Sequence, residues 1–526
     1  MTSGRLTLLR IAFLTVIAIC VALDVRRGRA GLSRTRVALA AWAAFMVAFV
    51  AFLWVDHVGF PGHLDLMEGT ILQHVAQAAH GLPVYPEPTP TYVPLAYNPL
   101  YYYLCVPFTW LLGLGLPTLR VVAILGMIGS GAVIFVAIRD RTASIWWAVI
   151  GVGLFATAYR VMDAYLDTAH SDSWLLCTAL AGSYVIDRAT TRAGRLAGVV
   201  LLVLSFWFKQ HGALFALGGL VFLTVRGGWR AAVPYWALAA VLGPLAYAAA
   251  VSWPFGPAFH YFTWDVPRAW SRVDGETFAR VIRFTAGNYL PLVAAACLPL
   301  VRVARRREPV SIWHVQFVVG IASAIMGSLD WGSSDNVFIP FGAFTIVLGT
   351  IGLAELPDAF GGALRSAAAA IAFVPLMYAP QTVILSRHAG VAYTDLVGVV
   401  RTLDGPVYAP GIGQSAGTPL FSPGAHWVAL EDMLRGPGHD AADSARARAL
   451  LAPLFDPAGR AYILTSTPRV METPPLASLA DRYTLARDFG TRFAALAGLP
   501  KRYDHKFPRY LYVSRDVPRD VSPGAP

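Results

Sequence analysis

Long apolar segments recur along this chain from its first residues to about residue 386, and then they stop. A helix needs roughly 20 consecutive apolar residues to cross the hydrocarbon core of a bilayer, and many of these segments approach that length. The chain is 56% hydrophobic and only 14% charged, whereas soluble domains are about 45–50% apolar and about 25% charged. The sequence therefore predicts a polytopic integral membrane protein and excludes an ordinary soluble domain.

The positive charges indicate which side of the membrane each loop faces. The formal net charge is +11, and many arginines lie in short loops between apolar segments, such as 26–36 (RRGRAGLSRTR) and 302–307 (RVARRR). Such loops face the cytoplasm in membrane proteins, so we interpret the excess charge as a topology signal and expect no nucleic-acid partner. With these loops inside, the sequence predicts about twelve spans, near residues 6–24, 37–55, 118–138, 144–160, 173–187, 194–208, 211–225, 231–251, 286–301, 312–328, 337–354 and 366–386.

One apolar segment, 99–116 (PLYYYLCVPFTWLLGLGL), does not fit this alternation. As a full span it would move Arg139 and Arg141 to the outer side. The segment contains three consecutive tyrosines, which favour the membrane interface, and an internal proline. We therefore predict a juxtamembrane or re-entrant helix at the outer face, with a full span as the alternative.

The chain changes character after the last predicted span. Residues from about 390 to 526 are polar and rich in proline, glycine, aspartate and arginine, and 405–410, 460–466 and 509–513 resemble short buried strands. We predict a mainly α fold, in which a transmembrane helical bundle at 1–389 has juxtamembrane helices in its first outer loop. A small extracytoplasmic α/β domain at 390–526 follows it.

Two carboxylates lie in the first outer loop, which runs from Asp56 to Asn98. Asp65 and Glu68 are three residues apart, at the start of a helix predicted over 66–80. An acidic residue at this place can simply cap the helix and complement its dipole. Alternatively, partial desolvation at the membrane face raises the pKa of a carboxyl group and makes it a useful general base. The residues alone leave both interpretations open.

Ionisable residues crowd into the second outer loop, MDAYLDTAHSDSW, which contains Asp163, Asp167, His170 and Asp172. Such groups beside a span are costly and usually functional, although Asp172 can also cap the next helix. Carboxylates with a histidine can bind a divalent cation, which is one alternative here, and we assign no metal ligand. The four cysteines lack CxxC spacing, so they predict neither a disulfide framework nor a zinc site.

Polar residues also interrupt two later apolar segments. Lys209, Gln210 and His211 break a long apolar run, SFWFKQHGALF. A lysine at a helix end can snorkel to the headgroups, but the predicted topology places Lys209 at the outer face, where a cation suits a phosphate group. Asp335 and Asn336 start a later span, and capping is their plain interpretation. Because all these polar groups lie on one predicted side, we expect an outward-facing polar cavity beside the lipid, suited to a lipid-phosphate-linked substrate.

The order of these motifs resembles that of the GT-C superfamily of membrane glycosyltransferases, which includes protein O-mannosyltransferases and lipid A aminoarabinose or galacturonic acid transferases. The resemblance covers residues 37 to about 355. Many relatives carry adjacent Asp-Glu in the first motif, whereas Leu66 and Met67 separate the two acids here. The matching segments are DLMEG, NPLYYYL, HSDSWLLCTAL, FWFKQHGALF and SSDNVFIPFGAFTIVLG.

The resemblance implies a reaction and its partners. A polyprenyl-phosphate sugar binds from the outer leaflet, and a first-loop acid deprotonates the hydroxyl of a lipid or glycan acceptor. This hydroxyl attacks the anomeric carbon while polyprenyl phosphate leaves; no cofactor is certain. The resemblance makes Asp65 or Glu68 the catalytic residue. The substrate-binding residues expected on the matching segments are Tyr97, Tyr101, Asp167, His170, Asp172, Lys209, Gln210 and Asn336.

We therefore expect a multi-pass protein of the cell membrane whose active site and C-terminal domain are extracytoplasmic and contact membrane lipids. Two other classes of protein remain open at the level of sequence. A transporter or flippase of a lipid-linked sugar is expected to have paired broken helices near the midplane and repeated halves. A non-catalytic protein of envelope polysaccharide assembly would tolerate loss of both Asp65 and Glu68.

Overall fold

The fold of this chain is mainly helical. The structure is a computed structural model that describes residues 2–27, 33–65, 67–90, 92–305, 308–330, 333–357, 362–385, 387–409, 427–434, 438, 440–452, 460–466, 468, 476–498 and 508–515. Its first part consists of α1 (Thr2–Arg27), α2 (Arg34–Val58), α3 (Met67–Ala79), α4 (Leu100–Leu112), α5 (Leu116–Thr142), α6 (Ile145–Thr157), α7 (Asp172–Arg188), α8 (Arg192–Phe208), α9 (Gly212–Gly227), α10 (Trp229–Ala240), η1 (Val241–Leu245), α11 (Ala246–Ser252), α12 (Pro257–His260), η2 (Tyr261–Asp265), α13 (Val266–Trp270), α14 (Gly275–Asn288), α15 (Leu290–Ala304), α16 (Ile312–Leu329), η3 (Asp335–Phe338), α17 (Ile339–Ala354), α18 (Ala363–Phe373), η5 (Val374–Leu376) and η6 (Pro380–Thr382).

Each predicted span coincides with a helix or a run of helices, but not all of these are long enough to cross a bilayer. Among the described residues, seven helices are long and apolar enough, or eight if the bent pair α14–α15 forms one span. The protein is thus an integral membrane protein with seven or eight candidate spans, where the sequence predicted about twelve. The other four, α6 to α9, have 13 to 17 residues, fewer than the roughly 20 that a span needs.

Helix α4 covers the segment that did not fit the predicted alternation. Its 13 residues extend for only about 20 Å at the helical rise per residue, which is less than the hydrocarbon thickness of about 30 Å. It packs against α3 and α5. The length of α4 therefore favours a juxtamembrane helix over a full span.

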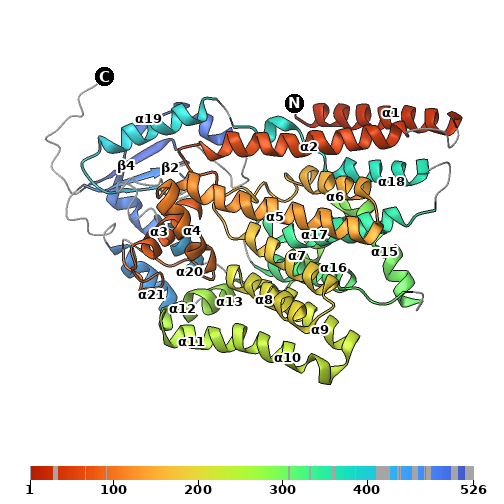
Figure 1. Cartoon of the computed structure of the whole chain (residues 1–526). Coiled ribbons are helices and arrows are strands. Elements are labelled where there is room, and N and C mark those ends of the chain that lie inside the picture. Colours follow the sequence, from red (N-terminus) through yellow and green to blue (C-terminus); the bar gives the residue numbers. More distant parts are fainter. Residues whose placement is uncertain are drawn as a thin grey trace.

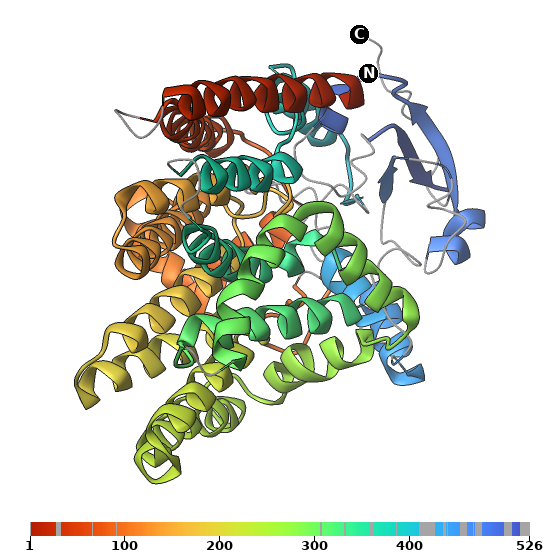
Figure 2. The same cartoon turned by 90° about the vertical axis from the view of Figure 1, so that its right-hand side faces the viewer.

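Helix α17 forms the centre of the bundle. All of its residues except Ala354 are buried, and it packs against α5, α6, α15 and α16. Helices α1, α2 and α5 run side by side across Figure 1. Helices α10 and α11 lie at the opposite edge of the bundle from α1, as Figures 1 and 2 both show.

The C-terminal part contains α19 (Ala389–Arg401), α20 (Trp427–Leu434), α21 (Ala441–Leu450), two short 3₁₀ helices, η10 (Leu476–Arg482) and η11 (Ala494–Gly498), and a small mixed sheet. Its strands are β1 (Val407–Tyr408), β2 (Tyr462–Thr465), β3 (Tyr483–Asp488) and β4 (Tyr510–Ser514), in the order β1-β2-β4-β3. The β1–β2 pair is parallel and the other two pairs are antiparallel. All three predicted strand segments contain a strand, whereas β3 was not predicted.

The C-terminal part packs closely against the helical bundle. Leu430 and Met433 of α20 belong to the main hydrophobic core, and the indole of Trp270 in α13 donates to the carbonyl of Asp432 at 2.7 Å. A second core joins Phe60 and Leu64, in the predicted first outer loop, to α19 and the sheet. The loop that carries the two first-loop acids is therefore held against the C-terminal sheet.

Candidate active site

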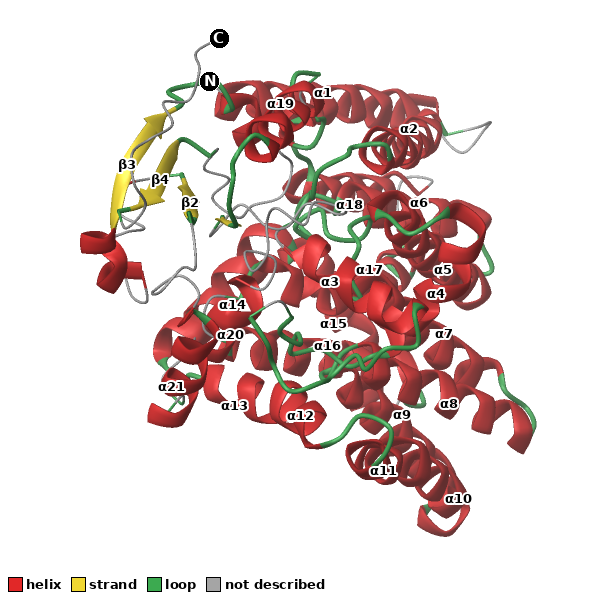
Figure 3. Cartoon of the chain, turned by 90° about the vertical axis from the view of Figure 1, so that its left-hand side faces the viewer, coloured by secondary structure: helices red, strands yellow, loops and turns green. Residues whose placement is uncertain are grey.

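The predicted polar residues come together at one end of the bundle. This end carries α3, α4, α19, α20 and the sheet, and Figure 3 looks onto it. Four separate segments meet there: the loop with Asp65, the loop with Tyr165 and Asp172, and the segments that carry Lys209 and Asn336. Tyr165 bonds to Asp65, and Lys209 and Asn336 both bond to Asp172. The convergence that the motifs suggested is therefore present in the fold.

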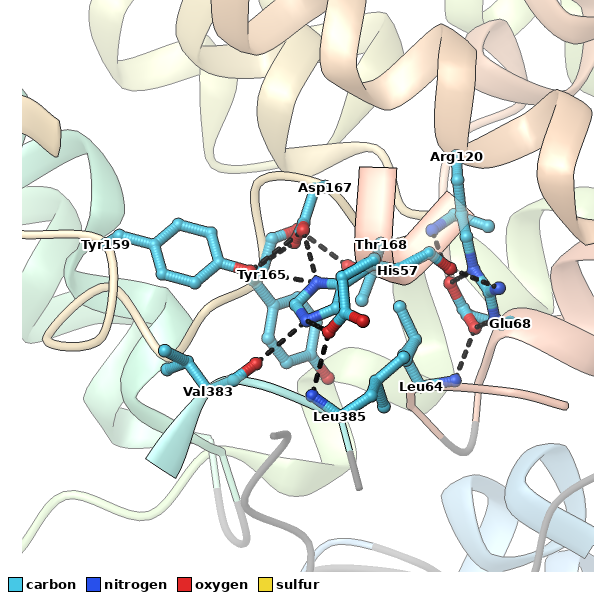
Figure 4. Close-up of polar contacts among 12 residues, drawn as sticks. His57, Leu64, Glu68, Arg120, Tyr159, Tyr165, Asp167, Thr168, Val383 and Leu385 are labelled. Atoms are coloured by element: carbon cyan, nitrogen blue, oxygen red, sulfur yellow. Dashed lines mark hydrogen bonds and ion pairs between the residues drawn. The ribbon is translucent and has the colours of Figure 1, made fainter. Parts of the chain in front are cut away.

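Glu68 lies in the first turn of α3 and forms a saturated ion pair. Arg120 of α5 donates from Nε to Oε1 at 3.0 Å and from Nη2 to Oε2 at 2.6 Å. The backbone N–H groups of Ala169 and Leu64 donate to the same two oxygens at 2.8 and 2.6 Å. Each carboxylate oxygen thus accepts two hydrogen bonds, and both side chains are buried. Figure 4 shows this group, which we call the Glu68 cluster.

Arg120 also holds the backbone that leads into the first outer loop. Its Nη1 donates to the carbonyls of His57 and Phe60 at 3.0 and 2.6 Å, and its Nη2 donates to the carbonyl of Gly62. The guanidinium therefore connects the end of α2 to the turn before Asp65. Arg120 is not among the predicted site residues, although a charged residue inside the predicted span 118–138 is a signal that could have identified it.

Asp65 is buried like Glu68 but has a different environment. Its Oδ1 accepts from the hydroxyl of Tyr165 at 2.7 Å, and its Oδ2 accepts from the backbone N–H of Met67, the first residue of α3, at 2.9 Å. It therefore bonds to the helix start, as the capping interpretation expected, and also to the second outer loop. Left-handed backbone at Asp163 and Ala164 (φ 60° and 53°) turns the chain just before Tyr165.

The two first-loop acids have opposite pKa shifts. Burial raises the pKa of Asp65 above its ordinary value, and the hydrogen bonds from Tyr165 and Met67 offset this only in part. Burial acts on Glu68 in the same direction, but the positive charge and hydrogen bonds of Arg120 outweigh it and hold its pKa below the ordinary value. A carboxylate whose pKa is raised accepts a proton more readily.

A second buried ion group surrounds Asp172 at the start of α7, and we call it the Asp172 cluster. Lys209 Nζ lies 2.9 Å from Asp172 Oδ1, His170 Nδ1 is in ion-pair contact with Oδ2, and the Asn336 amide donates to Oδ2 at 3.4 Å. The ring of Tyr97 lies under Lys209 Nζ at 5.2 Å, a cation–π distance. Five of the predicted substrate-binding residues are therefore neighbours.

The tight connection between α8 and α9 explains how Lys209 reaches this cluster. The backbone N–H of Gly212 donates to the carbonyl of Lys209 at 2.9 Å, and Ser205 Oγ donates to the carbonyl of Gly212 at 3.0 Å. A Cβ atom at position 212 would overlap the backbone of Ser205. The glycine therefore allows the close turn from which Lys209 extends toward Asp172.

The carboxylate of Asp167 is hydrogen-bonded to two buried side chains of the protein, Tyr159 and His57. It accepts from the hydroxyl of Tyr159 at 2.8 Å and lies 2.7 Å from His57 Nδ1. The other ring nitrogen of His57 lies 2.9 Å from the carbonyl of Val383, as Figure 4 shows. This network connects the second outer loop to α2 and to the chain after η6. The predicted role of Asp167 in substrate binding stays a prediction.

Two other predicted substrate-binding residues, Tyr101 and Gln210, donate hydrogen bonds to backbone carbonyls of neighbouring segments. The hydroxyl of Tyr101 donates to the carbonyl of Leu119 at 2.8 Å and connects α4 to α5. The Gln210 amide donates to the carbonyls of Ala96 and Thr263 at 2.8 and 3.0 Å. Direct contact of either residue with a substrate stays a prediction. Where the chain is described, no three histidine, cysteine or acidic side chains form a group that could hold a metal ion.

When this chain is compared with known proteins, it matches solved structures by its fold. No protein-family model matches this chain, and neither does any curated protein. Its fold matches that of GT-C membrane glycosyltransferases, which confirms the family resemblance at the level of the fold.

One of these structures is ArnT from Cupriavidus metallidurans in the apo state. It has a TM-score of 0.54 and 15% sequence identity over 90% of this chain and 98% of ArnT. ArnT bound to undecaprenyl phosphate gives a TM-score of 0.53 and 14% identity over the same shares. An oligosaccharyltransferase from Archaeoglobus fulgidus, in complex with zinc and sulfate, gives a TM-score of 0.42 and 13% identity, over 81% of this chain and 65% of its own.

Proposed function

We propose that this protein is a GT-C-type glycosyltransferase that moves a sugar from a polyprenyl-phosphate donor to an acceptor hydroxyl at the outer face of the cytoplasmic membrane. The observation that carries the proposal is the presence of a buried carboxylate and a buried cation at the same end of the bundle. Asp65 supplies a carboxylate with a raised pKa, and Lys209 supplies a cation in the adjoining cluster. The fold shared with ArnT, which has been observed with undecaprenyl phosphate, supports this donor class.

In this proposal Asp65, not Glu68, is the general base. Both oxygens of Glu68 are occupied by four donors, and Arg120 lowers its pKa. Asp65 accepts from Tyr165 and Met67 alone among the bonds described, and its pKa is raised. Glu68 instead fixes the loop that carries Asp65, because Arg120 donates both to the Glu68 carboxylate and to backbone carbonyls of that loop.

The proposed reaction has one proton transfer and one displacement. Asp65 takes the proton of the acceptor hydroxyl while the hydroxyl oxygen forms a bond to the anomeric carbon. The bond from this carbon to the phosphate oxygen breaks, and its electron pair stays on the departing polyprenyl phosphate. Negative charge grows on that phosphate, and a buried cation such as Lys209 stabilises charge that develops in the transition state.

A transfer assay with purified protein and a panel of polyprenyl-phosphate sugars tests this function. We expect Asp65→Asn to lower kcat by at least about 10³-fold, because general-base catalysis contributes roughly 10²–10⁴-fold. Its melting temperature is expected to stay equal or to rise, because a raised pKa means that the ionised carboxylate destabilises the fold above that pKa. Glu68→Gln is the matched variant; it is expected to melt earlier and to lose less kcat. Full activity of Asp65→Asn would refute Asp65 as the base, and absence of transfer with every donor would refute the function.

A further inference from the structure

His170 has a buried ring nitrogen that the fold does not satisfy. The side chain is 2% exposed, yet within the described part of the chain its Nε2 has no hydrogen-bond partner. A buried polar atom without a partner costs roughly 1–3 kcal/mol, and a catalytic role or a bound molecule is one explanation for such an atom in a native structure. Nε2 is therefore a candidate contact for a molecule that binds at this site.

The orientation of the imidazole is fixed on its other sides. Nδ1 is in ion-pair contact with Asp172 Oδ2. The ring makes T-shaped contacts with two tyrosines, with centroids 5.1 Å from Tyr97 and 5.3 Å from Tyr165. A protonated imidazole donates from both nitrogens. With Nδ1 in ion-pair contact with the Asp172 carboxylate, a protonated His170 still has an N–H at Nε2 that a ligand can accept from.

The same contacts place His170 beside the cation that is proposed to meet the phosphate. Lys209 and His170 share the carboxylate of Asp172, one on each oxygen. They also share the ring of Tyr97, which lies 5.2 Å from Lys209 Nζ and 5.1 Å from the His170 ring. A phosphate group held by Lys209 would therefore be close to His170. Tyr165, which also packs against His170, donates to Asp65.

Resting on the proposed function, we propose that His170 is a further catalytic residue, which donates a hydrogen bond from Nε2 to the leaving polyprenyl phosphate. As the bond between the anomeric carbon and the phosphate oxygen breaks, its electron pair moves onto that oxygen. The Nε2–H group of His170 stabilises the resulting charge, and its proton can pass to the phosphate, leaving a neutral imidazole. The acceptor proton is then on Asp65, so protons and charge balance.

Two variants separate this role from a structural one. In His170→Asn the amide nitrogen takes the place of Nδ1 and can keep the contact with Asp172, but nothing replaces Nε2. In His170→Gln the amide extends to about the position of Nε2. Removing one such donor costs about 10²–10³-fold in kcat, so we expect that loss for His170→Asn, with donor KM within about threefold, and roughly a tenfold loss for His170→Gln. Because the charge grows as the phosphate leaves, the affinity for undecaprenyl phosphate should fall more than the donor KM rises.

The control is the exposed His80, whose replacement by glutamine should leave kcat and melting temperature unchanged. If His170→Asn were more active than His170→Gln, or if kcat fell only in proportion to folded protein, the catalytic role of His170 would be refuted while Asp65 remained the proposed base. A wild-type protein that bound no undecaprenyl phosphate would refute the proposed function and this role together. Wild-type transfer with an unchanged rate in both His170 variants would refute this role alone.

Discussion

The Glu68 cluster and the Asp172 cluster are two buried ion groups at the same end of the bundle, and they differ in how completely their polar atoms are matched. In the first, four donors meet two carboxylate oxygens, and the remaining Arg120 donors described here meet backbone carbonyls. In the second, Lys209 and His170 share one carboxylate, and His170 Nε2 has no partner among the described residues.

This difference separates a structural role from a ligand-binding role. A fully satisfied buried network makes a local arrangement rigid, whereas a partly satisfied one pays a desolvation cost that only a further partner can offset. The Glu68 cluster connects α2, α3, α5 and the second outer loop, so it fixes the position of Asp65. In the Asp172 cluster, His170 Nε2 is left as a group to which an anion could bind. The comparison predicts that damage to the first group affects stability most, and damage to the second affects turnover most.

Arg120→Met is expected to have the largest effect. It leaves Glu68 buried without its cation, and removal of one partner of a buried pair typically costs about 3–5 kcal/mol. Equilibrium unfolding in detergent, followed by circular dichroism, measures this loss. The double variant Arg120→Met with Glu68→Met removes the unpaired charge and should regain much of the stability. A single variant as stable as the wild type would contradict a structural role of the Glu68 cluster.

Lys209→Met tests the other group. We expect kcat to fall by about 10²-fold, equivalent to ~2.7 kcal/mol of transition-state stabilisation, because in the proposed reaction Lys209 is the cation that meets the developing phosphate charge. Lys209→Arg keeps the charge and should retain more activity. The melting temperature should fall less than in Arg120→Met, since His170 and Asn336 still contact Asp172. A stability loss as large as that of Arg120→Met, without loss of turnover in the folded fraction, would remove the distinction between the clusters.

The sequence predicted the membrane class, the position of every long helix and the neighbourhood of the Asp172 cluster. These features follow from apolar segment length, from charge between spans, and from polar residues such as Lys209 that are too costly to bury without a partner. It could not separate Asp65 from Glu68, because their difference depends on Arg120, which is 52 residues away from Glu68 along the chain. Four of the twelve predicted spans, at α6 to α9, are helices of only 13 to 17 residues, since composition does not show where a helix ends.

Tyr165→Phe is expected to have the smallest effect, and it tests the link between Asp65 and the Asp172 cluster, because Tyr165 donates to Asp65 and packs against His170. The Tyr165 hydroxyl stabilises the ionised form of Asp65, so its removal raises the pKa of Asp65 further. Asp65 must be ionised to accept a proton, and the activity therefore increases as the pH rises through this pKa. The acid limb of the pH–kcat profile should move to higher pH in the variant. A shift of one unit corresponds to about 1.4 kcal/mol, or roughly a tenfold loss well below the pKa and little loss above it.

Tyr159→Phe is the matched control, because it removes a hydroxyl that bonds to Asp167 on the same loop at 2.8 Å. If Tyr165 acts through the ionisation of Asp65, the acid limb moves in Tyr165→Phe and stays in place in Tyr159→Phe, although both variants lose a buried hydroxyl that bonds to a carboxylate. Equal shifts would mean that the loop, and not the carboxylate, responds to the lost hydroxyl. An unchanged acid limb in Tyr165→Phe would mean that the group titrating in kcat is not Asp65, and the base would then have to be sought in the Asp172 cluster.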